Sequence, residues 1–363
     1  MSKDEPRVGI IGAGQLGRML ALAGYPLGIE CVLLDKDPRS PGAQVAPSIA
    51  AELDDHDALR RLARGVDVVT LDIENVSIDA LAALAGVAEI RPPVAAVAAA
   101  QDRLAEKELF RELGIPAAPF VAIDRAEDLG HAAALGWPLL LKTRRLGYDG
   151  RGQRLARSRD ELEAAWAELG QRPAIAEGWV RFDRELSLVG ARSSREAAFY
   201  PLAENTHRDG ILVSTVAPFE DAKLQRQAES WLRAIFDRFD YRGVLTIELF
   251  STRDGLLANE IAPRVHNSGH WTIEGAETSQ FENHLRAVLD WPLGDTAARG
   301  YAGMLNLLGS MPPRERVLAF RGAHLHDYGK DPRPGRKLGH CTLLDGSRDR
   351  LLERLDELRA VLA

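Results

Sequence analysis

Two glutamates, Glu248 and Glu260, have the residue type and the spacing of a metal site. Residues 244–250 and 256–262 are rich in apolar and β-branched side chains, which predicts two strands, and turn-forming residues separate them. If the hairpin is centred on Asp254, Glu248 lies directly opposite Glu260. Their Cβ atoms are then about 4.5–5.5 Å apart, a distance at which two like charges destabilise a sheet. A positive charge is therefore expected between them.

The chemistry of these side chains favours Mg²⁺ as that charge. Carboxylate oxygens and the amide of Asn259 are hard ligands, which suit Mg²⁺ held together with nucleotide phosphates. The alternative is an exposed hairpin with two solvated glutamates. The loop that follows favours the metal site, because it concentrates donors that can bind an anion, among them Arg264, His266 and Asn267.

A glycine turn near the N-terminus is a second candidate for anion binding. A buried strand, a helix and another buried strand follow one another there, which predicts a parallel sheet covered on both faces. Gly12, Gly14 and Gly17, with Asp35 farther on, match the dinucleotide-binding fingerprint and suggest a nicotinamide-dependent oxidoreductase. Such a turn would hold any phosphate or anion equally well. Nothing downstream supplies hydride-transfer chemistry.

Acidic and amide side chains end a later strand of the same sheet. Residues 67–73 form this predicted strand, which carries Asp72 and leads into Glu74 and Asn75. Open α/β sheets bind ligands at the carboxyl ends of their strands, so these side chains are candidate ligand contacts. They could equally cap a helix or remain solvated.

A glycine-rich stretch follows the predicted strand that ends in Lys142. Residues 143–153 contain arginines and several glycines, but the lysine precedes the glycines, so the stretch is not a P-loop. Its backbone N–H groups can still fold over phosphates. The alternative is a flexible hairpin.

A compact basic cluster lies near the C-terminus, in turns rich in glycine and proline. It includes Lys330, Arg336 and Lys337. Most basic clusters are solvated surface, whereas turns of this kind can bring side chains together on a ligand.

Composition excludes several classes of protein. A chain of 363 residues can form two or three domains, and its net charge of −7 gives no electrostatic reason to expect a nucleic-acid or anionic-membrane partner. The two cysteines, Cys31 and Cys341, fit no metal-binding spacing and no disulfide framework. No signal peptide or membrane-spanning run is predicted, so the expected location is the cytoplasm.

Taken together, these stretches resemble the ATP-grasp superfamily and, within it, the family of 5-(carboxyamino)imidazole ribonucleotide synthetases. Six segments carry the resemblance in order along nearly the whole chain: 14–19, 101–103, 142–153, 185–187, 259–271 and 333–340. The resemblance implies a mixed α/β and α+β protein. Its domains would be a Rossmann-like parallel-sheet domain at 1–101, an ATP-grasp domain at 102–290 whose subdomain 102–180 bears the lid, and a small C-terminal α+β domain at 291–363.

The resemblance also implies a set of site residues. ATP and Mg²⁺ would be the cofactors, with Glu248 and Glu260 as metal ligands. The nucleotide contacts would be Arg103, Lys142, Gly147, Tyr148, Asp149, Gly150, Arg151, Gly152, Gln153, Glu177, Gly178, Trp179, Val180, Glu185, His207, Asn259 and Glu260. Bicarbonate and the reacting phosphate would meet Arg264, His266, Asn267 and Lys142. The ribotide would contact Gln15, Leu16, Glu74, Tyr148, Lys330, Arg336 and Lys337.

The implied reaction is the ATP- and bicarbonate-dependent carboxylation of aminoimidazole ribonucleotide by a homodimer in purine biosynthesis. The chain departs from the family pattern at two places near the ribotide: Leu71-Asp72 stands where an aromatic residue and a glutamate are expected, and Pro47 where an aspartate is usual. Two further alternatives stay open, another ATP-grasp carboxylate–amine ligase and a non-catalytic nucleotide-binding module. The presence of Glu248, Glu260 and Lys142 argues against the second.

Overall fold

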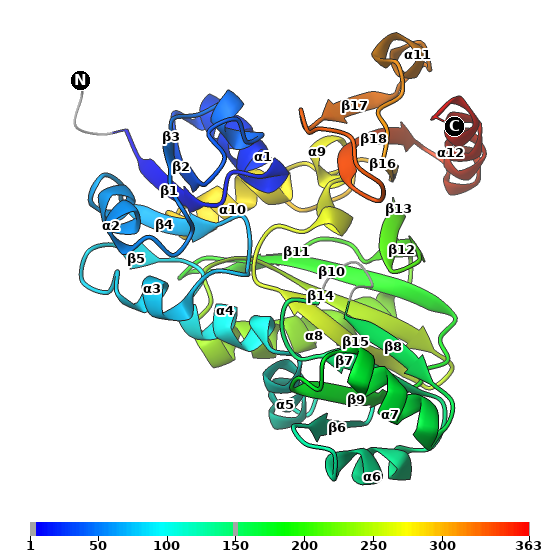
Figure 1. Ribbon diagram of the computed structural model, residues 1–363. Coiled ribbons are helices and arrows are strands. Elements are labelled where there is room, and N and C mark those ends of the chain that lie inside the picture. The colour runs from blue at the N-terminus through cyan, green and yellow to red at the C-terminus, as the bar shows by residue number, and fades with distance from the viewer. Residues whose placement is uncertain (1–4, 148–151, 363) are drawn as a thin grey trace.

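The computed structural model describes residues 5–147 and 152–362, which form three β-sheets (Figure 1). The N-terminal sheet has five parallel strands in the order β3-β2-β1-β4-β5. Its strands are β1 (Arg7–Ile11), β2 (Glu30–Asp35), β3 (Ser48–Ala50), β4 (Val68–Leu71) and β5 (Glu89–Ile90). The helices of this region are α1 (Gln15–Gly24), η1 (Tyr25–Leu27), η2 (Gly42–Gln44), α2 (His56–Arg64), α3 (Ile78–Ala82) and α4 (Val94–Gln101). The predicted parallel sheet is confirmed.

A four-stranded antiparallel sheet lies at the other end of the molecule, in the order β6-β9-β7-β8 (Figure 1). Its strands are β6 (Phe120–Ile123), β7 (Leu139–Thr143), β8 (Gln153–Ala156) and β9 (Ala174–Gly178). The helices of this part are α5 (Arg103–Glu112), α6 (Asp128–Ala132), η3 (Ala133–Leu135) and α7 (Arg159–Glu168). Leu139, Leu141 and Ala176 are fully buried in a small core that α6 and α7 close, so this sheet has its own apolar layer.

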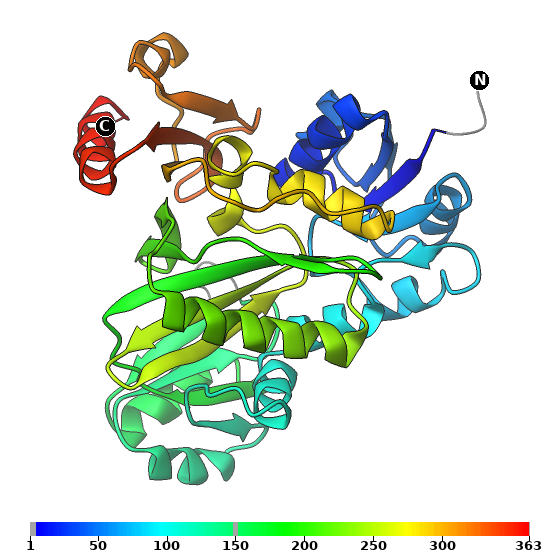
Figure 2. The ribbon, with the colours of Figure 1, turned by 180° about the vertical axis from the view of Figure 1, so that it is seen from behind.

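The central sheet has nine strands among the described residues. They are β10 (Arg184–Arg192), β11 (Ala197–Phe199), β12 (Ala203–Arg208), β13 (Ile211–Ala217), β14 (Gly243–Thr252), β15 (Gly255–Ala262), β16 (Tyr301–Leu308), β17 (His324–Asp327) and β18 (Lys337–Asp345). The remaining helices are α8 (Ala222–Phe239), η4 (Asn267–Gly269), α9 (Thr272–Gly275), α10 (Gln280–Val288), α11 (Arg314–Leu318) and α12 (Arg348–Leu362). The long helix α8 covers one face of this sheet (Figure 2).

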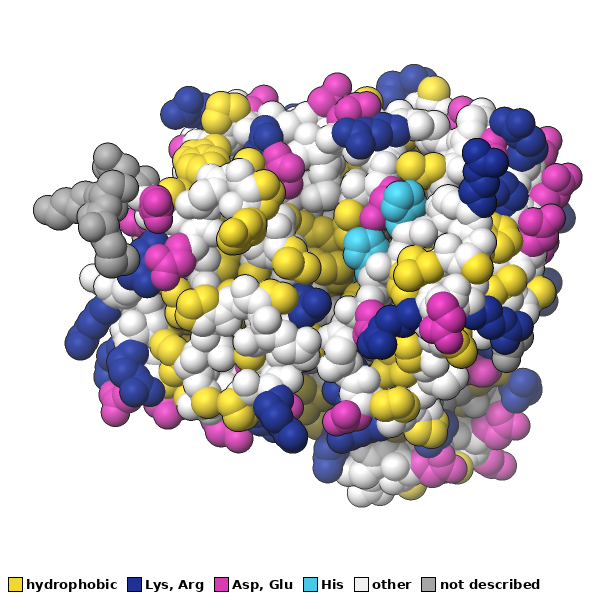
Figure 3. Space-filling view, turned by 90° about the horizontal axis from the view of Figure 1, so that it is seen from above, with side chains coloured by type: hydrophobic (Ala, Val, Ile, Leu, Met, Phe, Trp, Pro, Cys, Tyr) yellow, Lys and Arg dark blue, Asp and Glu magenta, His cyan; other side chains and the backbone are white. Residues whose placement is uncertain are grey.

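The strands of the predicted C-terminal domain continue the central sheet. β16 pairs with β13 and β18 pairs with β16, so the sheet runs unbroken from β13 into the C-terminal segment. Seen from above, the surface is hollowed between the N-terminal domain and this segment, and histidine side chains lie at one side of the hollow (Figure 3). The C-terminal strands thus form one wall of an opening, with the N-terminal domain as the other.

A side chain of the protein itself, that of Asp72, binds the N–H groups of the glycine turn in the N-terminal domain. One carboxylate oxygen of Asp72 accepts hydrogen bonds from the N–H groups of Gly14 (2.6 Å) and Gly17 (3.0 Å), at the start of α1. Asp35 accepts a further bond from Ala13 N–H. Gly12 has φ +93°, and a Cβ there would lie 1.8 Å from Asp72 Oδ1, so the turn is shaped around this carboxylate.

The oxidoreductase interpretation of the glycine turn is therefore wrong. The N–H groups that would bind a pyrophosphate already bind Asp72, which lies 58 residues away from Gly14 in the chain. The alternative prediction, that Asp72 caps a helix, is confirmed, because Asp72 accepts hydrogen bonds at the start of α1. Burial raises the pKa of Asp72 to about 6, while the two backbone hydrogen bonds stabilise its ionised form.

A single buried histidine joins the N-terminal sheet to the central sheet. His284, on α10, accepts a hydrogen bond from the Val244 N–H of β14 at Nδ1 (3.0 Å), so its other nitrogen carries the proton and donates to Thr70 Oγ1 of β4 (2.7 Å). Burial lowers the pKa of His284 to about 3, which keeps the ring neutral as this pair of bonds requires. α10 thus ties the N-terminal sheet to the central sheet, although the whole four-stranded sheet lies between them in the chain.

None of the described helices combines the length and the apolar character that crossing a membrane requires. Both cysteines are buried and unpaired, as the absence of a disulfide pattern predicted. Burial raises the pKa of each thiol to about 12, so both remain protonated and unreactive near neutral pH.

We expect Asp72→Ala to destabilise the protein, because it leaves two N–H groups at the buried start of α1 without an acceptor. Loss of a helix cap typically costs about 1–2 kcal/mol. The measurement is the thermal midpoint by circular dichroism. Asp72→Asn is the matched control, since its amide oxygen can still accept from Gly14 and Gly17. An unchanged midpoint in Asp72→Ala would show that the carboxylate does not stabilise the turn.

Candidate functional site

A β-bulge creates the carboxylate pair. The β14–β15 hairpin begins with Thr252 opposite Gly255 and keeps one register as far as Leu249 opposite Ala258. The next pair is Glu248 opposite Glu260, so Asn259 is an extra residue in β15. The predicted pairing of the two glutamates is confirmed. Its basis differs from the prediction, because the loop is centred one half-residue before Asp254 and the bulge restores the register.

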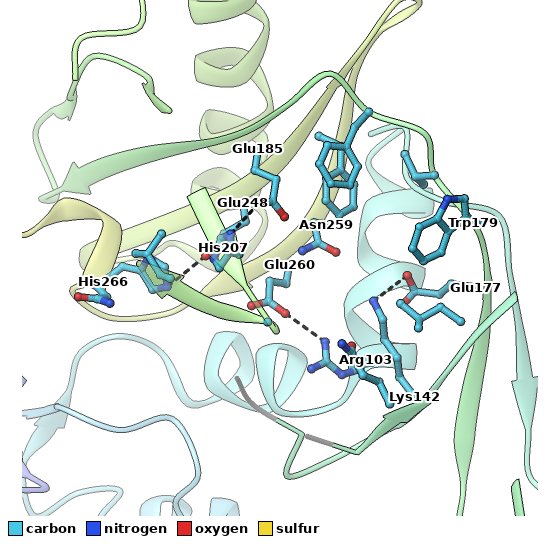
Figure 4. A pocket seen from close by; sticks show the side chains of 18 of the residues that line it. Arg103, Lys142, Glu177, Trp179, Glu185, His207, Glu248, Asn259, Glu260 and His266 are labelled. Carbon is cyan, nitrogen blue, oxygen red and sulfur yellow. Dashed lines mark hydrogen bonds and ion pairs between the residues drawn. The ribbon is translucent and has the colours of Figure 1, made fainter. Parts of the chain in front are cut away.

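The two glutamates face a cavity of about 340 Å³ between the central and the four-stranded sheets (Figure 4). Most of the predicted nucleotide contacts line this cavity, although they come from six strands, helix α5 and the segment that follows β9. The predicted residues that line it are Arg103, Lys142, Gln153, Glu177, Gly178, Trp179, Val180, Glu185, His207, Glu248, Asn259, Glu260, His266, Asn267 and Lys337. Residues far apart in the sequence therefore meet around one space of the size that small-molecule sites occupy.

A buried ion-pair group forms one end of the cavity. Lys142 Nζ donates to Glu177 Oε2 (3.0 Å), and Lys107 Nζ lies 3.8 Å from the same oxygen. Burial lowers the pKa of Lys142, although the Glu177 carboxylate opposes the shift. Glu177 Oε1 is buried and has no partner among the described residues. Lys142, which lines the cavity, is thus paired with a single carboxylate oxygen, whereas Lys107 is not part of the cavity lining.

Arg103 connects this group to the carboxylate pair. Its guanidinium lies 3.1 Å from Glu260 Oε2 and also donates to the carbonyl of Gly147 (3.2 Å), at the start of the glycine-rich stretch (Figure 4). Asp102 caps α5 by accepting from Leu104 N–H, and it also accepts from Arg144. Because of this cap, Arg103 occupies the first position of α5, beside the cavity.

The two facing carboxylates differ in protonation. Burial and the charge of Glu260 raise the pKa of Glu248 to about 7. Burial acts in the same direction on Glu260, but Arg103 and Lys142 outweigh it and lower the pKa of Glu260. One buried carboxylate is therefore compensated by protein cations and the other is not. A divalent cation between them would supply the missing charge, so the residues present fit Mg²⁺.

His266 and His207 flank Glu248. Burial lowers the pKa of His266 to about 3, and its Nδ1 accepts from Ser268 N–H, so the neutral ring carries its proton on Nε2, 3.3 Å from Glu248 Oε1. His207 Nδ1 lies 2.7 Å from Glu185 Oε2. Burial acts to lower the pKa of His207, but the bond to Glu185 and the charge of Glu248 raise it. The two imidazoles fix the orientation of neighbouring carboxylates.

Asn267 presents an unsatisfied amide to the cavity. Neither its oxygen nor its nitrogen has a hydrogen-bond partner among the described residues, although both atoms are shielded from solvent. Buried polar groups are almost always hydrogen-bonded, and an exception in a cavity points to a ligand that has both a donor and an acceptor. Bicarbonate has both.

Five of the predicted ribotide residues lie outside the cavity lining, namely Gln15, Leu16, Glu74, Lys330 and Arg336. Arg264 is not part of the cavity lining and forms a two-pronged ion pair with Glu74. Lys330 donates to Gln15 Oε1, which brings the C-terminal cluster against the first turn of α1. Leu16, beside Gln15, is buried. This group spans the N-terminal domain and the C-terminal segment.

The basic cluster divides between two places. Arg336 donates to the carbonyl of Asp331 and lies at the surface turn, whereas Lys337 lines the cavity with Glu248 and His266. A bulge at Leu338 follows Lys337 in β18, because Leu308 pairs with Lys337 while Leu307 pairs with Gly339.

Parts of the predicted glycine-rich stretch lie outside the described residues, namely Tyr148, Asp149, Gly150 and Arg151. Gly147 and Gly152 flank this gap. Gly152 has φ +72°, and its carbonyl accepts from Thr143 N–H (2.8 Å).

Sequence reasoning missed two aromatic residues and two charged ones. Phe182 and Phe250 stack on the cavity wall, with ring centroids 4.6 Å apart. Phe250 could have been found, because it lies two residues after Glu248 and so shares its face of the strand. Glu106 and Lys107 are three and four residues after Arg103, which places them on the same side of α5.

The chain matches three family models along its length. They are a ribonucleotide synthetase preATP-grasp domain at residues 6–101, an ATP-grasp domain at 108–281 and a phosphoribosylaminoimidazole carboxylase C-terminal domain at 302–354. Among curated relatives, the chain is 48% identical over 358 residues to an N5-carboxyaminoimidazole ribonucleotide synthase of Pseudomonas aeruginosa, covering 98% of this chain and 99% of the relative. The corresponding synthase of Bacillus subtilis is 37% identical over 96% of this chain and 94% of the relative.

Solved structures agree with these matches. An N5-carboxyaminoimidazole ribonucleotide synthetase from Thermus thermophilus superimposes with a TM-score of 0.92 at 50% identity, covering 98% of this chain and 97% of the other. A synthase from Aspergillus clavatus in complex with ADP and 5-aminoimidazole ribonucleotide has a TM-score of 0.92 at 33% identity, covering 99% and 98%. Fold, cavity and full-length similarity lead to one conclusion: the chain belongs to the N5-carboxyaminoimidazole ribonucleotide synthase family of ATP-grasp enzymes.

Proposed function

We propose that the protein carboxylates 5-aminoimidazole ribonucleotide with ATP and bicarbonate, giving the N5-carboxyamino product, ADP and phosphate. The observation that carries this proposal is the unsatisfied Asn267 amide beside the Glu248–Glu260 pair. A group suited to bicarbonate and groups suited to a metal-bound phosphate line the same cavity, which supports the proposal. The family membership supports the same activity.

The first half-reaction joins bicarbonate to the γ-phosphate of ATP, because bicarbonate is a poor electrophile until one of its oxygens carries a leaving group. This step needs charge neutralisation more than covalent help. Lys142 and Arg103 would hold the phosphates, and Glu248 and Glu260 would hold Mg²⁺, which withdraws charge from the phosphate oxygens when bound. His266 and Asn267 would orient bicarbonate, with Arg264 behind them.

The nucleotide would lie along the part of the cavity that residues 177–185 line. The segment 177–180 and the stacked Phe182 and Phe250 offer backbone groups and apolar surface for adenine. Glu185, held by His207, would accept from the ribose hydroxyls. The stretch 147–153, from Gly147 to Gln153, would close over the phosphates.

The second half-reaction transfers the carboxyl group to the ribotide amine. Carboxyphosphate, or the CO₂ that it releases, must meet the amine before water does, so the two sites must adjoin. Lys337 lies at this junction, since it lines the nucleotide cavity and follows Arg336 in the ribotide cluster. Glu74, Gln15, Leu16, Tyr148, Lys330 and Arg336 would bind the ribotide itself.

We further propose that the protein acts as a cytoplasmic homodimer. Two buried, protonated thiols suit a reducing compartment. Sedimentation velocity over a range of protein concentrations tests the oligomeric state.

ATP hydrolysis should require Mg²⁺ and bicarbonate and should be strongly stimulated by aminoimidazole ribonucleotide, because the two sites serve successive steps. Phosphate release is measured with each component omitted in turn. Another ATP-grasp ligase would respond to a different carboxylate in place of bicarbonate. Full turnover in bicarbonate-depleted buffer would contradict the proposal.

Glu260→Gln should lower kcat by roughly 10²-fold, the scale for loss of one electrostatic stabiliser. The reason is that one of the two facing carboxylates loses its charge, so Mg²⁺ dependence should also weaken. The measurement is initial rate against Mg²⁺ concentration. If the variant keeps the normal rate at low Mg²⁺ concentration, the Glu248–Glu260 pair does not bind the metal.

Arg336→Ala should raise the KM for the ribotide by roughly 10- to 100-fold, equivalent to about 1.4–2.7 kcal/mol. The ribotide phosphate is remote from the reacting bond, so its contact acts as uniform binding and kcat should change less. The KM for ATP serves as the internal control. If ATP is affected and the ribotide is not, Arg336 belongs to the nucleotide site.

A further inference from the structure

Two buried residues of α5, Glu106 and Lys107, form hydrogen bonds with the backbone of β15. β15 is the edge strand of the central sheet, so one row of its backbone groups has no strand partner. Glu106 Oε1 accepts from Ile261 N–H at 2.6 Å, and Lys107 Nζ donates to the Asn259 carbonyl at 2.7 Å. Both side chains are only 2% exposed. Neither lines the cavity, so the reaction itself assigns them no role.

These two contacts match the bulged form of β15 and no other. In an unbroken strand, outward-facing N–H groups recur at every second residue. Ala258 N–H faces outward, where it donates to Pro116 O (2.7 Å), so the next outward N–H would be that of Glu260. The bulge at Asn259 moves it to Ile261, which is the group that Glu106 accepts.

The alternative register would dismantle the carboxylate pair. Without the bulge, the pairing of Leu249 with Ala258 would continue with Glu248 opposite Asn259 and Ile247 opposite Glu260. Glu260 would then share the face of Ile247, which lies fully buried in the core beneath α8. A shift of one residue moves a side chain to the other face of a sheet.

We propose that Glu106 and Lys107 are positioning residues that select the bulged register and so hold Glu260 opposite Glu248. This inference rests on the proposed binding of Mg²⁺ by that pair. Arg103, on the same face of α5, contacts the Glu260 side chain directly. One helix face thus holds the metal-site strand by both backbone and side chain.

The test compares ADP affinity with Mg²⁺ and with EDTA, by isothermal titration calorimetry. In the unaltered protein Mg²⁺ should strengthen ADP binding. Lys107→Met and Glu106→Leu should lose this strengthening by about tenfold, the lower range for losing support of a metal ligand. Their affinity in EDTA should change little. Glu106→Gln should behave normally, because it keeps an acceptor for Ile261 N–H.

A second readout is hydrogen–deuterium exchange of the peptide 256–262, which should quicken in Lys107→Met and Glu106→Leu but not in Glu106→Gln. Glu108→Gln, on the half-exposed side of α5, is the matched control. Two results would overturn the inference: full Mg²⁺ strengthening in both variants, or an equal loss with and without Mg²⁺, which would make Lys107 a charge for the nucleotide. If even the unaltered protein shows no Mg²⁺ effect, the proposed metal site fails instead.

Discussion

Two carboxylates face each other across neighbouring strands at the wall of a cavity, where the side chain of Glu248 is 15% exposed and that of Glu260 is 40% exposed. At about 5 Å and an effective dielectric constant of about 20, two such charges repel by about 3 kcal/mol. The structure relieves this on one side only, where Arg103 and Lys142 neutralise Glu260. Glu248 instead has its pKa raised to about 7 by burial and by Glu260. The carboxylate pair therefore carries more negative charge than the neighbouring cations of the described residues compensate.

The parts of this arrangement that are local in sequence could be predicted. Apolar and β-branched runs located β14 and β15. The predicted pairing of Glu248 with Glu260 is correct, although it came from a turn centre that is half a residue off. The bulge itself was not predictable, because its cause lies on α5, where Glu106 and Lys107 bind the backbone of β15. Propensity describes a residue with its neighbours, whereas a bulge is selected by contacts about 150 residues away.

The glycine turn shows the same limit of prediction from sequence. The spacing of Gly12, Gly14 and Gly17 describes a helix start that can hold an anion, and the structure does hold one there. Sequence spacing does not distinguish a bound phosphate from Asp72 of the same chain. Likewise, Arg336 and Lys337 are adjacent in the sequence, yet only Lys337 lines the cavity, while Arg336 donates to the carbonyl of Asp331. Adjacency in the sequence does not tell which of two neighbouring side chains enters a cavity.

The imidazole of His284 links the N-terminal sheet to the central sheet. It donates to the N-terminal sheet and accepts from the central sheet, so separating the two would leave buried polar groups without partners at about 1–3 kcal/mol each. Those two sheets are therefore tied to each other at a buried point, and the four-stranded sheet takes no part in this pair of hydrogen bonds. Because β16 and β18 belong to the central sheet, the two walls of the opening between the N-terminal domain and the C-terminal strands are held in place by one imidazole behind them.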